Sequence, residues 1–201
     1  MTPNFGILVL AAGQASRFGS DKLLAQMPDG QPVIAHSLAP LLVMAERYDL
    51  NLCVVSRSDN KALNEYLTAH DIPYTVCPEA HLGMGHSIAH GVNSNPLWQG
   101  WMIALADMPN LTNSIVEVLI TNIIQHPDLV VRPSYVKADL NIPAHPVYFP
   151  QDYRLKLSQL TGDDGAKSII KQQTLLDITE ISNLMDVDTP EALEQISLLK
   201  D

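Results

Sequence analysis

The sequence predicts an α/β fold, in the form of a Rossmann-like three-layer domain with a mostly parallel, mixed sheet. Short apolar runs alternate along the chain with amphipathic stretches whose apolar residues recur at helical spacing. This alternation is typical of parallel strands whose sheet is covered by helices on both faces. The length of 201 residues suits one sizeable core, and no internal repeat, low-complexity tract or linker divides it. We therefore expect residues 1–201 to form a single domain.

The apolar runs and the helical patterns define the expected elements. The expected strands are Gly6–Ala11, Leu52–Ser56, Tyr74–Cys77, Trp101–Ala106, Leu129–Arg132 and Val147–Phe149, and the expected helices are Val33–Arg47, Asn60–His70 and Ser114–Gln125. No clear helix precedes Val147–Phe149, so we expect an antiparallel strand or a hairpin there. Ligands of such sheets bind at the carboxyl ends of strands. The loops after Ala11 and Ala106 and a late acidic cluster are therefore the segments where we expect the site.

Composition excludes several classes of function. A net charge of -10 leaves no surplus of Lys and Arg to neutralise nucleic acid or an acidic membrane. Cys53 and Cys77 each lie in an apolar run, which favours two core residues over a disulfide framework or a metal site. The first five residues lack the basic region of a signal peptide, and the apolar stretch behind them is too short to span a membrane. We expect a cytoplasmic protein.

A glycine-rich segment follows the first strand. It contains Gly13 and Gly19, several small residues, and the basic residues Arg17 and Lys22. Glycines let backbone N–H groups approach phosphate oxygens, while Arg grips a phosphate in bidentate fashion and Lys supplies a point charge. The spacing differs from both the P-loop and the dinucleotide-binding glycine pattern. The segment predicts a phosphate-binding loop of another type, with a surface loop carrying incidental charges as the alternative.

Two acidic points lie far apart in the sequence. Asp107 directly follows an apolar strand, where a carboxylate can hold a metal against phosphates, although a turn before Pro109 would explain it too. Asp188 belongs to the segment Asp186–Glu191, in which it could equally cap a helix that begins near Pro190. Both interpretations of Asp188 are compatible, because a residue at a helix start can also face a metal.

The run from Leu10 to Leu24, with its pattern L-A-A-G, R-F-G and K-L-L, resembles the molybdenum-cofactor cytidylyltransferases of the MobA-like NTP transferase family. The resemblance extends from Leu8 to Leu193 and includes Asp-Met-Pro at Asp107. It implies a fold of the nucleotide-diphospho-sugar transferase type, with catalytic Arg17, Lys22 and Asp107. It further implies a metal site at Asp107 and Asp188, with Asp186 a weaker candidate, which holds magnesium or alternatively manganese. The implied nucleotide-binding residues are Leu10, Ala11, Ala12, Gly13, Arg17, Gly19, Lys22, Gly85, Ser87 and Asp107.

Two further segments resemble the acceptor side of this family. His145 lies in Ala-His-Pro-Val, and Gly162, Asp163 and Gly165 lie in a Gly-Asp-x-Gly-Ala segment that the resemblance places near a pterin acceptor. A packed histidine and a plain turn before a helix are the alternatives.

Ser87 could be either a helix cap or a ligand hydroxyl, and the resemblance assigns no role to His86. His86 and His90 are one helical turn apart, but no third residue stands at a spacing typical of zinc sites.

The resemblance implies transfer of CMP from CTP to the phosphate of molybdopterin, with release of pyrophosphate. The expected partners are a nucleoside triphosphate, a molybdopterin-type molecule and a client molybdoenzyme, and neither nucleic acid nor a membrane. Two alternatives stay open: a nucleotidyltransferase that acts on a sugar or polyol phosphate, and a non-catalytic carrier of the molybdenum cofactor. The intact set of Arg17, Lys22, Asp107 and Asp188 favours an enzyme over the carrier.

Overall fold

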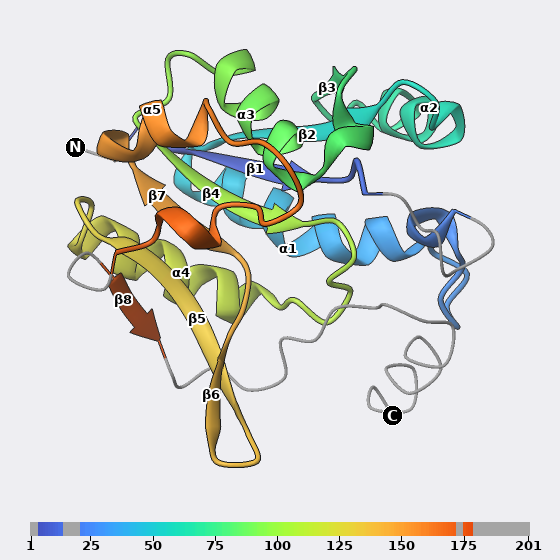
Figure 1. Cartoon of the computed structure of the whole chain (residues 1–201). Helices are drawn as coiled ribbons and strands as arrows, with labels where there is room; N and C mark the ends of the chain where they lie inside the picture. The colour runs from blue at the N-terminus through green and yellow to red at the C-terminus, as the bar shows by residue number, and fades with distance from the viewer. Residues whose placement is uncertain (1–3, 14–20, 172–174, 179–201) are drawn as a thin grey trace.

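The computed structural model describes residues 4–13, 21–171 and 175–178 (Figure 1). Within these residues, eight strands form one mixed sheet with the order β3-β2-β1-β4-β7-β5-β6, and β8 pairs with β5. The strands are β1 Gly6–Leu10, β2 Asn51–Arg57, β3 Tyr74–Cys77, β4 Gly100–Leu105, β5 Val130–Lys137, β6 Leu140–Pro143, β7 Val147–Pro150 and β8 Leu175–Ile178. The α-helices are α1 Val33–Tyr48, α2 Lys61–Ala69, α3 Met84–Ser94, α4 Asn113–Gln125 and α5 Arg154–Leu157. Short 3-10 helices lie at η1 Lys22–Leu24, η2 Ala80–Leu82, η3 Gln151–Tyr153 and η4 Lys167–Ile169.

Alternate residues of β1 serve two separate cores. Ile7 and Val9 pack with residues of α1, α2 and α4, whereas Leu8 and Leu10 pack with residues of α3 and α5. Successive side chains of a strand point to opposite faces, so each face of this buried strand needs its own layer of helices. The helices accordingly lie on both sides of the sheet (Figure 1), and the predicted three-layer α/β architecture is confirmed.

The strand directions follow the predicted pattern. β1 pairs in parallel with β2 and β4, and β2 pairs in parallel with β3. β7 runs antiparallel to β4, as expected for a strand that no helix precedes. The predicted strand Leu129–Arg132 is longer than expected: β5 runs on to Lys137 and turns into β6 through Ala138 and Asp139, which both have positive φ. Sequence periodicity missed β6 because its residues are mostly exposed.

Helix α3 lacks a clear helical pattern in the sequence because small residues interrupt its apolar face. A Cβ atom at Gly91 would come within 2.6 Å of the Leu8 side chain, so this glycine lets α3 lie close against β1. Ser87 is the fourth residue of α3 and is buried, with Gly83 at the N-cap position. The suggestion that Ser87 caps a helix is therefore wrong.

The other predicted helices agree with the structure to within one residue at their starts. Asn60 caps α2, with its side chain accepting a hydrogen bond from the Leu63 N–H, and Thr112 caps α4 in the same way through the Ile115 N–H. In the part of the chain that the structure describes, none of the helices is long and apolar enough to cross a membrane.

Candidate active site

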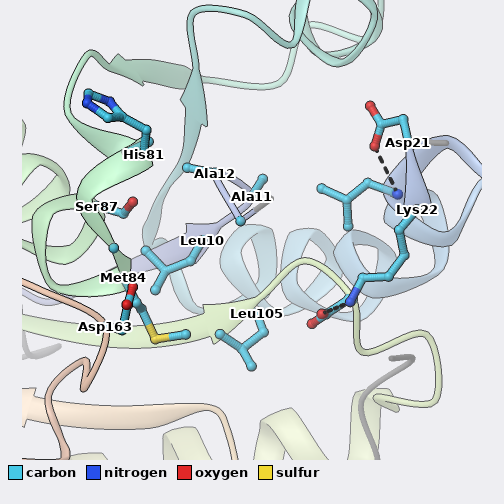
Figure 2. A pocket seen from close by; sticks show the side chains of 15 residues that line it. Leu10, Ala11, Ala12, Asp21, Lys22, His81, Met84, Ser87, Leu105 and Asp163 are labelled. Atoms are coloured by element: carbon cyan, nitrogen blue, oxygen red, sulfur yellow. Dashed lines mark hydrogen bonds and ion pairs between the residues drawn. The ribbon is translucent and has the colours of Figure 1, made fainter. Parts of the chain in front are cut away.

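A pocket of about 380 Å³ opens at the carboxyl ends of β1 and β4 (Figure 2). Its walls come from segments far apart in sequence: the end of β1, η1, the start of α3, the end of β4 and the loop before η4. The lining residues are Leu10, Ala11, Ala12, Gly13, Asp21, Lys22, Leu23, Ala80, His81, Gly83, Met84, Ser87, Leu105, Asp107 and Asp163. This is the sheet edge at which the fold class predicts a ligand site.

The end of β1 forms a floor of small residues that the sheet holds in place. The Ala11 N–H donates to the Val55 carbonyl at 2.8 Å, and the Ala106 N–H donates to the Leu10 carbonyl at 3.1 Å. Ala11 and Ala12 are each 2% exposed, and a Cβ atom at Gly13 would meet nothing within 4 Å. A flat backbone without bulky side chains allows a ligand to approach the main chain closely.

Lys22 and Asp107 meet across the pocket. The Lys22 ammonium lies 2.6 Å from Asp107 Oδ2, and the two side chains are 15% and 20% exposed. Asp21 fixes the start of η1, because its Oδ1 accepts a hydrogen bond from the Leu23 N–H at 3.1 Å. Sequence reasoning predicted Lys22 and Asp107 but missed Asp21, although an Asp directly before a basic helix start is a familiar capping pattern.

Two carboxylate oxygens of this pocket have unmet hydrogen-bonding capacity. Asp107 Oδ1 and Asp21 Oδ2 are both buried, and neither has a hydrogen-bond partner among the described residues. A buried ionised oxygen without a partner costs free energy unless a cation or a donor joins it. Hard carboxylate oxygens are the ligands that magnesium and manganese prefer. Within the described residues these side chains do not form a set of three ligands, so further ligands would have to come from other groups.

The start of α3 forms the opposite wall together with the segment Thr161–Gly165. Met84, Ser87 and Asp163 lie on this wall (Figure 2). Gly83 has a φ of 119°, and a Cβ atom there would collide with the Asp163 side chain and the Gly162 backbone. The Gly85 N–H donates to the Gly162 carbonyl at 2.8 Å. Glycines at the first turn of α3 thus allow the predicted acceptor segment to lie directly on it.

Replacing Gly85 by alanine is expected to destabilise the protein by about 1–3 kcal/mol, because of overpacking. The new Cβ atom would lie 2.6 Å from the Thr161 carbonyl oxygen, and backbone atoms cannot yield as a flexible side chain can. Urea denaturation measures the change in the free energy of unfolding. Gly13→Ala is the matched control, since it adds the same atom to open space. Equal stability of the two variants would contradict the close contact at Gly85.

His145 lies behind the pocket and is not one of its lining residues. Its Nδ1–H donates to the Ile103 carbonyl of β4 at 3.3 Å. Burial lowers the pKa of His145 below its ordinary value, while the hydrogen bond to Ile103 and the Asp107 carboxylate act in the opposite direction. Through this hydrogen bond to Ile103, His145 contacts the strand that leads to Asp107.

The lowered pKa of His145 predicts that acid destabilises the fold. Between the lowered pKa and the unfolded value of about 6.5, the unfolded chain binds more protons than the folded one, so the unfolding free energy falls as pH decreases. The loss from one such group is at most about 1.4 kcal/mol per pH unit. His145→Asn, which retains a donor but does not titrate, should lose less stability than the wild type between pH 7 and 5. Urea melts at several pH values measure this, and parallel curves would contradict it.

The structure brings together most of the predicted nucleotide-binding residues that it describes. Those that line the pocket are Leu10, Ala11, Ala12, Gly13, Lys22, Ser87 and Asp107, joined by Asp163 from the predicted acceptor set. The wall also contains three predicted residues that do not line the pocket themselves. The Gly85 N–H donates to the Gly162 carbonyl, and Gly165 approaches the Met84 side chain. Arg17, Gly19, Asp186 and Asp188 lie outside the described residues.

Several lining residues were missed by sequence reasoning. They are Asp21, Leu23, Ala80, His81, Gly83, Met84 and Leu105. The apolar ones look like ordinary core residues in the sequence, and only the chain path shows that they face a pocket. His86 and His90, the pair of histidines at helical spacing, do not line it: His86 Nδ1 accepts from the Gly162 N–H, and His90 Nε2 pairs with the Thr75 hydroxyl.

Comparison with known proteins identifies related chains. The MobA-like NTP transferase domain matches residues 7–177. The purine catabolism protein PucB of Bacillus subtilis (strain 168) is 29% identical over 202 residues, which cover 93% of each chain.

Solved structures agree in fold. Rv0371c from Mycobacterium tuberculosis H37Rv, in complex with manganese, matches with a TM-score of 0.71 and 19% identity over 97% of this chain and 98% of that one. CMP:2-keto-3-deoxy-manno-octonic acid synthetase, in complex with CTP, matches with a TM-score of 0.74 and 15% identity over 98% of each chain. At these identities the likeness concerns the fold, and it confirms the predicted nucleotide-diphospho-sugar transferase type.

Proposed function

Because this chain belongs to the MobA-like NTP transferase family and is thus a nucleotidyltransferase, we propose that it transfers CMP from CTP to the phosphate of molybdopterin and releases pyrophosphate. One observation carries the proposal: Lys22 and Asp107 form an ion pair beside Leu10–Gly13, and Asp107 Oδ1 is buried with no hydrogen-bond partner in the part of the chain that the structure describes. A metal cation and a cationic side chain are groups that stabilise the charge of a triphosphate.

The charge of the pocket argues for a divalent cation. Its described lining carries three carboxylates, those of Asp21, Asp107 and Asp163, against one ammonium, that of Lys22. A triphosphate would be repelled by this set unless positive charge accompanied it. Magnesium, with manganese as the alternative, fits the buried Oδ1 of Asp107, and we assign Asp188 as a further ligand on the strength of the family resemblance. Such a metal, when bound, neutralises charge on the phosphates and on the departing pyrophosphate.

The residues of this chain would hold the two substrates for in-line displacement. Arg17, Gly19 and Lys22 bind the triphosphate, while the floor residues and the start of α3, with Gly85 and Ser87, hold the nucleoside. An oxygen of the acceptor phosphate attacks the α-phosphorus, a P–O bond forms there, and the bond to the β-phosphate oxygen breaks. No general base is needed, because a phosphate monoester with a second pKa of roughly 6 is already ionised near neutral pH.

The acceptor would lie on the side of the pocket that carries Asp163. We place Gly162, Asp163 and Gly165 at the acceptor, with His145 supporting the end of β4 from behind. A client molybdoenzyme would receive the product. We also propose that residues 1–201 form one domain. The choice of CTP rests on Leu10–Gly13 alone. These residues read Leu-Ala-Ala-Gly, as in the cytidylyltransferases, whereas the guanylyltransferases resemble Leu-Ala-Gly-Gly, so Ala12 replaces the first glycine of that pattern.

Pyrophosphate release tests the proposal. The purified protein is incubated with magnesium and molybdopterin, and CTP, GTP, ATP and UTP are compared. Release with CTP alone supports the proposal. Release with another nucleotide refutes the base assignment, and release only when a sugar or polyol phosphate replaces molybdopterin refutes the acceptor assignment. Binding of molybdopterin without turnover, by protein shown to be folded, would instead favour a carrier.

A further inference from the structure

The loop Thr161–Gly165 is attached to α3 by two backbone contacts at Gly162. The Gly162 carbonyl accepts from the Gly85 N–H at 2.8 Å, and the Gly162 N–H donates to His86 Nδ1 at 3.3 Å. Both backbone polar groups of Gly162 are therefore hydrogen-bonded to neighbouring residues of α3. The next residue, Asp163, lines the pocket, and its carboxylate lies beside Gly83. It shares this wall with Met84 and Ser87 (Figure 2).

The two contacts differ in what they require of the sequence. The Gly85 contact uses only the backbone, together with the absence of a side chain. The contact with His86 needs a side chain that accepts a hydrogen bond, because the Gly162 N–H requires an acceptor where the loop packs on the helix. A ring nitrogen that accepts must be unprotonated, so His86 is in the tautomer with its proton on Nε2. Nothing in the pocket uses His86 directly, since it is not among the lining residues.

We propose that His86 is a positioning residue that fixes the Thr161–Gly165 loop on α3 and so holds Asp163 in the pocket for binding of the acceptor. Gly162 has a φ of 70°, a conformation that a glycine adopts easily but also leaves easily. With the hydrogen bond from Gly162 to His86 removed, the hydrogen bond from Gly85 is the one of the two that would still hold Gly162 on α3. The inference rests on the proposed function for the identity of the acceptor, but the contact itself does not depend on it.

The test compares His86→Leu with His86→Asn. Leucine removes the acceptor atom, whereas asparagine places an amide oxygen on the same Cγ atom that carries Nδ1, so it restores an acceptor. His90→Leu is the matched control, because His90 is one turn further along α3 and pairs with Thr75 instead of the loop. Amide hydrogen exchange of Gly162 in the free protein and steady-state kinetics with CTP and molybdopterin are measured on all variants.

We expect His86→Leu to speed exchange of the Gly162 amide about tenfold and to raise KM for molybdopterin about five- to tenfold, as for loss of one hydrogen bond. KM for CTP should change less than twofold, and His86→Asn should recover most of both effects. Unchanged exchange in His86→Leu would overturn the proposal, and so would faster exchange with an unchanged acceptor KM.

The two proposals fail separately. A wild-type protein that does not turn over molybdopterin refutes the proposed acceptor, whereas the exchange measurement needs no substrate and still decides whether His86 holds the loop. If molybdopterin is not turned over, the kinetics use the acceptor that is active in the pyrophosphate assay. An unchanged KM of His86→Leu for that acceptor would overturn the positioning role.

Discussion

Replacing Asp107 by alanine is expected to lower kcat/KM by about 10³-fold or more, which is the scale of losing a principal electrostatic group of an active site. Asp107 Oδ2 pairs with Lys22, and Asp107 Oδ1 is buried with no partner from residues 4–13, 21–171 or 175–178, so both oxygens are available to the pocket. The substitution removes the described carboxylate best placed to hold a metal at the end of β4. It also removes the carboxylate that lies 2.6 Å from the Lys22 ammonium. Pyrophosphate release under saturating magnesium measures the effect.

Asp128→Ala is the matched control for this experiment. Asp128 is exposed and lies with Asn4 and Gln99 at the opposite edge of the sheet, remote from the candidate site. Both variants should show the same far-ultraviolet circular dichroism as the wild type, which would establish that the fold is intact. An Asp107→Ala variant that still turns over in a metal-dependent manner would refute the assignment of Asp107.

Replacing Lys22 by methionine is expected to lower kcat/KM about 10²-fold, because one cationic group that faces developing negative charge is removed. Methionine keeps the length and the apolar stem of the side chain, so the change is mainly one of charge. The nucleotide-free variant should bind manganese more tightly than the wild type does. The reason is that the Lys22 ammonium, 2.6 Å from Asp107 Oδ2, competes with a cation for the same carboxylate.

Isothermal titration calorimetry with manganese alone separates these two effects of Lys22→Met. Lys61→Met is its matched control, since Lys61 is exposed at the first residue of α2. Manganese affinity that falls in Lys22→Met would show that Lys22 assists the metal instead of competing with it. A kcat/KM equal to that of the Lys61 control would remove Lys22 from the catalytic set.

Local patterns were sufficient for most of the fold. The apolar runs predicted β1, β2, β3, β4 and β7 to within one or two residues, because a buried strand leaves a continuous apolar run in the sequence. The helices α1, α2 and α4 were predicted for the same reason. The missed elements are those whose sequences carry little periodicity: α3 with its two internal glycines, the exposed β6, the one-turn α5 and the short β8.

The sequence by itself determined which segments carry the chemistry. A glycine-rich loop after a buried strand and an Asp at the end of another strand are local features, and parallel strands bring their carboxyl ends to one edge of the sheet. Lys22 and Asp107, separated by 85 positions, were therefore both assigned to this edge, and the structure adds that they form a hydrogen-bonded pair.

Only the tertiary structure decided which distant segments form the wall of the pocket opposite Lys22 and Asp107. Gly162 contacts Gly85 and His86, which are about 76 positions away in the sequence. These residues are not in paired strands, so no local pattern predicts the contact. The same holds for Asp21 and Met84, whose roles in the sequence look like a helix cap and an ordinary apolar residue. The place of Met84 in the site depends on how α3 packs against the loop Thr161–Gly165, and that of Asp21 on how η1 lies beside the end of β4. Packing between distant segments follows from shape, which a single sequence does not display.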